Sequence, residues 1–103
     1  MASHRFHIGD VLSITTKRIF SPRGILGIRG ILAFMSGVGG PDDTSITDTG
    51  CVLLTPHCTE ELIRQHPWLQ EIDASGVTPE NADDFLADLV RKHGEFLEVT
   101  SMN

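Results

Sequence analysis

Three glycines, Gly24, Gly27 and Gly30, recur at every third position of an apolar segment, and this spacing restricts the fold more than any other feature of the sequence. A glycine inside a helix costs about 1 kcal/mol relative to alanine, so three of them need a structural reason. The large apolar side chains of the segment follow helical spacing, at Ile25, Ile28, Leu32 and Met35. We therefore expect a helix with a smooth glycine stripe, against which another backbone or a flat ligand lies closely.

Three Ser/Thr–Pro pairs predict helix starts. A serine or threonine at the N-cap accepts a hydrogen bond from the helix, and a proline at the first position lacks only an N–H group that would be unpaired anyway. The pairs are Ser21–Pro22, Thr55–Pro56 and Thr78–Pro79. We expect Pro67 to limit the second helix and Gly94 to end the third. The buried face of the third helix is expected to consist of Phe85, Leu86, Leu89 and Val90.

Two segments at opposite ends of the chain have the alternating pattern of half-buried strands. In residues 5–16 the side chains expected on the inner side are Phe6, Ile8, Leu12 and Ile14. In the closing segment EFLEVT, Phe96 and Val99 are expected to point inward. The predicted fold is α+β, with these two strands forming a small antiparallel sheet packed with about three helices.

The length of 103 residues predicts a single domain that spans residues 1–103. Residues 36–50, rich in Gly and Asp, are expected to form a long loop, of a kind that is often functional or mobile. No run of about 18 uncharged apolar residues occurs, and the N-terminus lacks the pattern of a secretory signal. We therefore expect a cytoplasmic protein without a membrane partner, in which Cys51 and Cys58 are thiols.

Charge is divided unevenly along the chain. The net charge is -6, yet residues 1–29 hold five lysines and arginines against one aspartate, whereas residues 30–89 hold eleven acidic residues and one arginine. An acidic total argues against general DNA binding, while a basic island on an acidic body suits one local anionic ligand. The predicted ligand-binding residues are Thr15, Thr16, Lys17, Arg18, Arg23 and Arg29. Their hydroxyls, charges and a helix start would hold phosphate, and the alternative is a solvated basic turn.

The acidic remainder supports a second hypothesis, in which the chain inhibits a basic protein partner such as the nucleic-acid channel of a nuclease complex. The predicted partner-binding residues are Asp42, Asp43, Asp48, Glu60, Glu61, Asp83, Asp84 and Asp88. The single tryptophan, Trp68, is expected to plug the core at a helix end, and together with the glycine stripe it could also make oligomer contacts. A homo-oligomer is favoured slightly over a monomer because the predicted core is thin.

Catalytic and metal sites receive little support from the sequence. Cys51, His57, Cys58 and His66 fall close together, but the paired ligand spacings of zinc sites are missing. No Gly-x-Ser-x-Gly segment or cysteine-nucleophile signature is present. We therefore predict no catalytic residue, no metal and no cofactor, and a small hydrolase that uses His57, Cys58 or His66 is the least favoured alternative.

The segments FHIGDVLSITT, SPRG, ILAFMSG, HPWLQEID and GEFLEV together resemble an uncharacterised family of short proteins encoded by tailed bacteriophages and prophages. The chain departs from the family pattern at Lys17, where the pattern has glycine, and in the segment after Gly37. The resemblance implies a small accessory protein in the host cytoplasm that acts by stoichiometric binding rather than catalysis. In counter-defence it would sequester a nucleotide signal or, like anti-CRISPR proteins, block a host complex.

Overall fold

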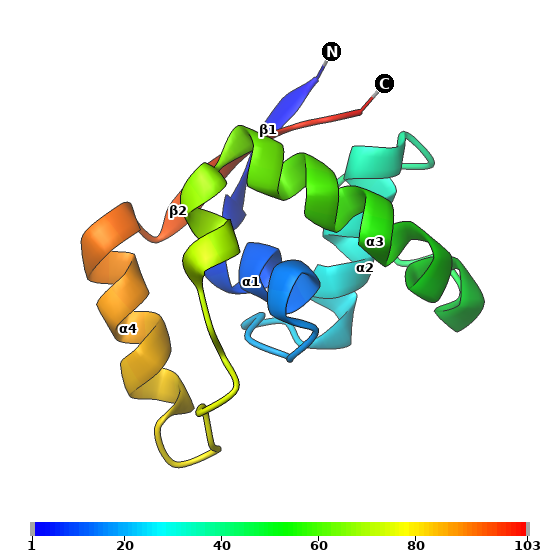
Figure 1. Ribbon diagram of the computed structural model, residues 1–103. Helices are drawn as coiled ribbons and strands as arrows, with labels where there is room; N and C mark the ends of the chain where they lie inside the picture. The colour runs from blue at the N-terminus through cyan, green and yellow to red at the C-terminus, as the bar shows by residue number, and fades with distance from the viewer. Residues whose placement is uncertain (1, 103) are drawn as a thin grey trace.

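The structure, a computed structural model, describes residues 2–102 (Figure 1). Its elements in chain order are β1 (Ser3–His7), α1 (Ile8–Thr16), α2 (Ile25–Ser36), α3 (Asp48–Gln65), the 3-10 helix η1 (Pro67–Glu71), α4 (Ala82–His93) and β2 (Phe96–Thr100). The expected α+β fold is confirmed. Residues 2–102 contain four α-helices, whereas about three were expected. No helix within residues 2–102 combines the length and the apolar character needed to cross a membrane.

The sheet consists of the first and last strands, as expected. They pair antiparallel, with Ser3 opposite Thr100 and His7 opposite Phe96, so the two ends of the chain leave the sheet on the same side (Figure 1). The inward residues of the last strand were predicted partly wrongly. Leu97 and Val99 are buried, whereas Phe96 is 46% exposed and packs its ring edge-on against that of His7. Phe96 therefore covers the outside of the sheet.

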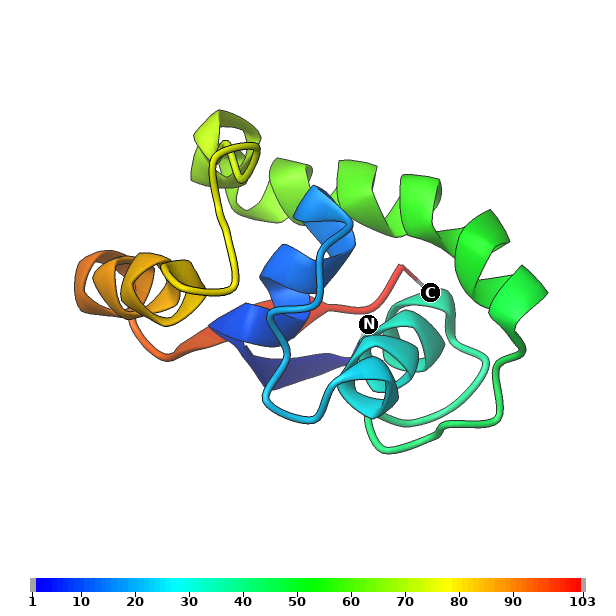
Figure 2. The same cartoon turned by 90° about the horizontal axis from the view of Figure 1, so that it is seen from below.

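The prediction of a strand over residues 5–16 is wrong beyond His7, because the chain turns into helix α1 there. Every residue from Ile8 to Ile14 is buried, including Gly9, Asp10 and Ser13. Figures 1 and 2 show why: α1 lies in the middle of the molecule, with α2, α3, α4 and the sheet around it. A helix that is buried on all sides lacks the polar stripe that identifies a helix in a sequence.

Helix α3 begins earlier than predicted. Its N-cap is Thr47, whose hydroxyl accepts a hydrogen bond from the third residue of the helix, and Pro56 lies inside the helix. The hydroxyl of Thr55 donates to the carbonyl of Cys51 one turn back, at 2.7 Å, so Thr55 acts as a helical residue rather than a cap. The loop expected over residues 36–50 is therefore shorter than predicted: Ser36 is the last residue of α2, and residues 48–50 form the first turn of α3. The predicted end of the helix just before Pro67 is confirmed.

The other two predicted helix starts are also a few residues off. Helix α2 begins after Gly24, and the Ser21–Pro22 pair forms a preceding turn in which the Gly24 N–H donates to the Ser21 carbonyl. Helix α4 begins after Asn81, so Thr78–Pro79 again lies one turn outside the helix. Its end is as predicted: Gly94 has φ 95, a conformation that favours glycine. Its inner face is as predicted, with Leu89 buried and Phe85, Leu86 and Val90 packed partly against the core.

The glycine stripe of α2 packs against other segments of the same chain. A Cβ atom at Gly30 would collide with the carbonyl oxygen of Pro41, and one at Gly27 would collide with the side chains of Ser21 and Asp10. The expected close approach of another backbone is therefore made by the loop between α2 and α3. The same helix supplies the centre of the core with Ile31, Leu32, Ala33, Phe34 and Met35, all buried.

Candidate functional site

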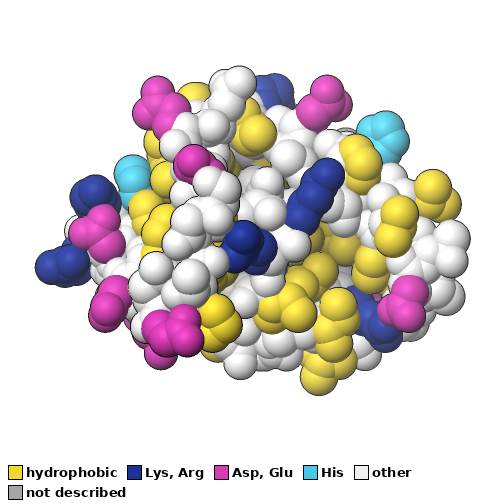
Figure 3. Space-filling model, turned by 60° about the horizontal axis from the view of Figure 1, so that its bottom comes forward, with side chains coloured by type: hydrophobic (Ala, Val, Ile, Leu, Met, Phe, Trp, Pro, Cys, Tyr) yellow, Lys and Arg dark blue, Asp and Glu magenta, His cyan; other side chains and the backbone are white. Residues whose placement is uncertain are grey.

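A hollow of about 400 Å³ opens where the end of α1 and the segment after it face α2 and α3. Its apolar lining includes Ile14, Ile19, Val52 and Pro56, and its cationic lining is Lys17 and Arg18. We call it the Lys17 hollow. Figure 3 looks at this side of the molecule, where hydrophobic side chains gather around lysine and arginine side chains and most acidic side chains lie toward the edges. The lining is thus mainly apolar, with positive charge at one margin.

Lys17 reaches the hollow through an unusual backbone conformation. It caps the C-terminus of α1 with φ 62 and ψ 25, and it is the only non-glycine residue with positive φ among residues 2–102. A side chain in this left-handed region costs roughly 1–2 kcal/mol relative to glycine. The backbone here is therefore of the kind that favours glycine, and this chain places a lysine on it.

The two cations of the hollow are not neutralised by acidic neighbours. The ammonium group of Lys17 has no carboxylate partner in the part of the chain that the structure describes. Arg18 donates from Nη1 to the carbonyl oxygen of Val77 at 2.6 Å, which orients the guanidinium without cancelling its charge. Since a guanidinium has five N–H donors, most of those on Arg18 remain for a ligand.

A buried serine holds the segment that carries these cations. The Ser13 hydroxyl donates to the carbonyl of Gly9 at 2.8 Å and accepts from the backbone N–H groups of Phe20 and Ser21 at 2.8 and 3.0 Å. One side chain of α1 thereby satisfies two backbone donors of the following turn, which are buried and would otherwise lack partners. Ser13 therefore fixes the far end of residues 17–20 against α1.

The predicted threonines lie beside the hollow but point into their own helix. Thr16 donates from its hydroxyl to the carbonyl of Leu12 at 2.6 Å, and Thr15 lies 3.5 Å from the same oxygen. Thr16 also accepts from the N–H of Arg18 at 3.4 Å. Both threonines thus shape the end of α1, and neither lines the hollow.

The remaining two predicted cations form ion pairs elsewhere. Arg23 lies between two carboxylates, 3.6 Å from Asp10 and 3.2 Å from Asp42, and Arg29 lies 2.5 Å from Asp48. Of the six predicted ligand-binding residues, the structure therefore brings only Lys17 and Arg18 together at a hollow with free charge.

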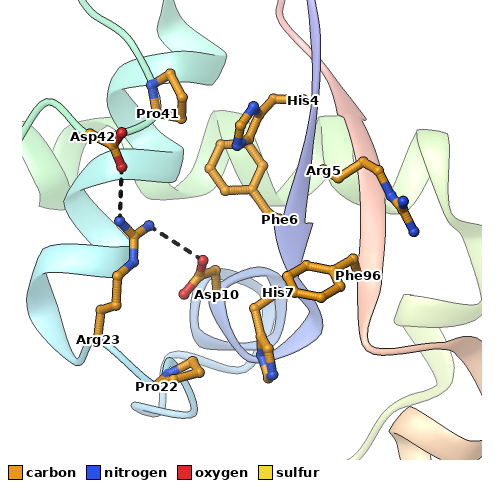
Figure 4. A pocket seen from close by; sticks show the side chains of 10 residues that line it. All are labelled: His4, Arg5, Phe6, His7, Asp10, Pro22, Arg23, Pro41, Asp42 and Phe96. Atoms are coloured by element: carbon orange, nitrogen blue, oxygen red, sulfur yellow. Dashed lines mark hydrogen bonds and ion pairs between the residues drawn. The ribbon is translucent and has the colours of Figure 1, made fainter.

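Arg23 borders a separate hollow of about 280 Å³ between β1, α1 and the loop after α2, shown in Figure 4. The buried Asp10 carboxylate accepts a hydrogen bond from Ser21 and points toward Arg23, while the aromatic ring of Phe96 lies across from them. The Arg5 guanidinium has no carboxylate partner within residues 2–102 and lies 5.9 Å from the centroid of the Phe96 ring, whereas Arg23 is matched by two carboxylates that also line the hollow, Asp10 and Asp42. This hollow is accordingly a less suitable anion site than the Lys17 hollow.

The predicted acidic residues are dispersed over the molecule. Figures 1 and 2 place α4, with Asp83, Asp84 and Asp88, at one end and the loop before α3 at the other. Several of these residues also have partners within the chain. Arg64 lowers the pKa of Glu61, and Lys92 lowers that of Asp88, in both cases chiefly through a side-chain hydrogen bond. The acidic residues therefore do not lie on one continuous face.

Of the cysteines and histidines considered for catalysis, Cys58 is buried in the core and His66 makes a structural contact. Within residues 2–102, no three His, Cys, Asp or Glu side chains are grouped so that they could hold a metal ion. Burial raises the pKa of the Cys58 thiol to about 11, so it is protonated and a poor nucleophile at neutral pH. The Nε2 atom of His66 lies 2.7 Å from the carbonyl oxygen of Glu98 and connects α3 to β2.

The apolar lining of the Lys17 hollow was missed in the sequence, because Val52 and Pro56 are far from Lys17 along the chain and the start of α3 was misplaced. The available signal was their spacing: once α3 is started at Thr47, Val52 and Pro56 are four residues apart on one helix face. A second signal was Ile19, an apolar residue in a basic turn, which is 68% exposed in the structure.

In comparisons with protein-family models, curated proteins and solved structures, the chain has no match. The choice of a candidate binding site therefore rests on the geometry described above.

Proposed function

We propose that this protein is a non-enzymatic binding protein, and that it captures a small anionic ligand with a flat apolar part, such as a nucleotide, in the Lys17 hollow. One observation carries the proposal: two cations without carboxylate partners, Lys17 and Arg18, stand at the margin of an apolar hollow. Its volume of about 400 Å³ lies within the range of small-ligand sites, roughly 300–1,000 Å³. Apolar walls would bury a ring, and the cations would pair with phosphate.

The backbone at Lys17 supports the same proposal. Glycine would adopt φ 62 without strain, so a lysine at this position lowers the stability of the fold. Strained residues of this kind cluster at functional sites. A charge that recognises a ligand is a physical reason for keeping lysine there.

The biological setting is proposed from the resemblance of the N-terminal segment to phage and prophage proteins. A phage accessory protein that binds a nucleotide stoichiometrically would act in counter-defence by sequestering a signal in the host cytoplasm. The competing proposal, an acidic inhibitor of a nuclease complex, needs a continuous acidic surface. Because the acidic residues lie at both ends of the molecule, we prefer ligand capture.

Calorimetric titration with the 5′-monophosphates of adenosine, guanosine, cytidine and uridine tests the proposal. We expect at least one of them to bind, and Lys17→Gly and Arg18→Ala each to weaken that binding about tenfold or more, because each removes a charge-assisted contact. Lys92→Ala is the matched control, since Lys92 is an exposed cation that pairs with Asp88 on α4. It should leave the affinity within about twofold.

The stability of Lys17→Gly separates loss of the site from loss of the fold. Because glycine relieves the backbone strain, the free energy of unfolding of this variant should be unchanged or up to about 1 kcal/mol higher. Weaker binding by a variant that is no less stable would support the assigned site. Absence of binding to all of the monophosphates, or equal binding by wild type and both hollow variants, would show that the proposal is wrong.

A further inference from the structure

A second hollow, of about 470 Å³, adjoins the Lys17 hollow. We call it the Pro79 hollow; it lies between the segment after α1 and the turn before α4, and Thr78 and Pro79 are part of its lining. Arg18 and Ile19 line both hollows. The two hollows are therefore neighbours on either side of the same two residues.

The Pro79 hollow has features that suit a planar ring. Its lining includes Phe20, whose ring stacks on that of Phe85 at a centroid separation of 5.5 Å and an interplanar angle of 29°. Pro79 and Ala82 add apolar surface to the same lining. Phe20 is only 8% exposed, so the exposed apolar side chains of Ile19 and Pro79 supply most of the surface against which a base would pack.

Arg18 is placed to hold a negative group between the two hollows. Its hydrogen bond to the carbonyl of Val77 joins the segment after α1 to the turn that precedes α4, and thus spans the boundary. Its remaining N–H groups are free to contact a phosphate there. Lys17 adds a second positive charge on the side of the first hollow.

We propose that the ligand is a dinucleotide. One base lies in the Lys17 hollow, the other lies in the Pro79 hollow, and the guanidinium of Arg18, beside Ile19, binds the phosphate that links them. This inference rests on the proposed function, because it extends the same site. It predicts that a ligand with two bases binds more tightly than one with a single base, since the second base gains contacts without a second loss of translational freedom.

The test compares 5′-monophosphates with the linear dinucleotides pApA, pGpG, pCpC and pUpU by calorimetric titration, in the wild type and in Thr78→Trp. Thr78 is exposed and lines only the second hollow, so a tryptophan there fills that hollow without entering the core. The matched control is Thr49→Trp, which makes the same change at an exposed position on α3 that lines neither hollow.

We expect the best dinucleotide to bind the wild type about tenfold more tightly than its monophosphate. Thr78→Trp should remove that advantage and leave monophosphate binding within about twofold, whereas Thr49→Trp should change neither affinity. Monophosphate binding without a gain for any dinucleotide, or a gain that survives Thr78→Trp, would overturn the two-hollow inference and leave the proposed function standing. If no monophosphate binds the wild type, both proposals are wrong, whether or not a dinucleotide binds.

Discussion

The indole ring of Trp68 lies parallel to the imidazole ring of His93, with the ring centroids 3.6 Å apart and an interplanar angle of 3°. This stack joins η1 to the last turn of α4, at a place where Trp68 is half-buried and His93 is exposed. Trp68 is partly packed against the core, as a residue at a helix end was expected to be. As the only tryptophan in the chain, it reports on the packing of α4.

Replacement of His93 by alanine should loosen α4. Because stacked ring pairs contribute about 0.5–1.5 kcal/mol beyond their buried area, we expect the free energy of unfolding to fall by that amount. Tryptophan fluorescence should shift to longer wavelength as the indole becomes more exposed. His93→Phe keeps a ring over the indole and serves as the control. Identical stability and emission in the two variants would argue against a role for the stack.

Ser13→Ala should be one of the more destabilising single changes outside the apolar core. It leaves the buried N–H groups of Phe20 and Ser21 without an acceptor, which should lower the free energy of unfolding in urea by about 2–4 kcal/mol. Thr15→Ala is the control, because the Thr15 hydroxyl makes only a long contact of 3.5 Å. A change of less than about 0.5 kcal/mol is expected there. Equal effects of the two substitutions would contradict the role assigned to Ser13.

The packing of α2 against the following loop can be tested by comparing two Gly→Ala substitutions, one at Gly30 in α2 and a control at Gly40 in the loop. At Gly30 an added methyl group meets the carbonyl oxygen of Pro41, so Gly30→Ala should displace the loop before α3 and cost about 1–3 kcal/mol in urea unfolding. At Gly40 nothing lies near the added methyl group, so Gly40→Ala should be neutral or stabilise by up to about 1 kcal/mol. If Gly30→Ala were as stable as Gly40→Ala, the close contact of α2 with the loop would not exist.

The Cys58 thiol should ionise only in strongly alkaline solution. Burial raises its pKa from 9.0 to about 11, so the stability linked to this group is fully present below pH 9 and is lost as the pH rises toward 11. The chain has no tyrosine, so thiolate absorbance in the ultraviolet can follow the titration directly. In Cys51→Ser, the remaining thiolate should appear near pH 11 in the folded protein and near pH 9 in urea. The same midpoint in both states would mean that Cys58 is not buried.

Helix ends were largely predictable, because they depend on local chemistry, whereas the pairing of the first and last strands is a long-range contact that was predicted because the sequence has only two segments with a strand pattern. Gly94 ends α4 through a positive φ, and Pro67 ends α3 because it cannot continue the hydrogen-bond pattern of the helix. The starts were less predictable. A Ser/Thr–Pro pair fits the first turn of a helix, the turn before it and, as Pro56 shows, an interior position.

The middle of the N-terminal segment could not be predicted from its pattern. Ile8, Leu12 and Ile14 alternate as in a strand, but all three are buried in α1 together with the residues between them. When every side of a helix is buried, the sequence no longer distinguishes inside from outside. The surrounding elements decide the conformation in such a case.

For the candidate site, the sequence alone identified which residues are cationic, that they are concentrated in one segment, and that the rest of the chain is acidic. Only the tertiary structure decided which of those charges remain free. Arg23 and Arg29 meet carboxylates that lie beyond α2, whereas Lys17 and Arg18 meet apolar surface from α3 and the carbonyl of Val77. The physical reason is that a residue type sets a charge, whereas its partners come from distant segments that folding brings to it.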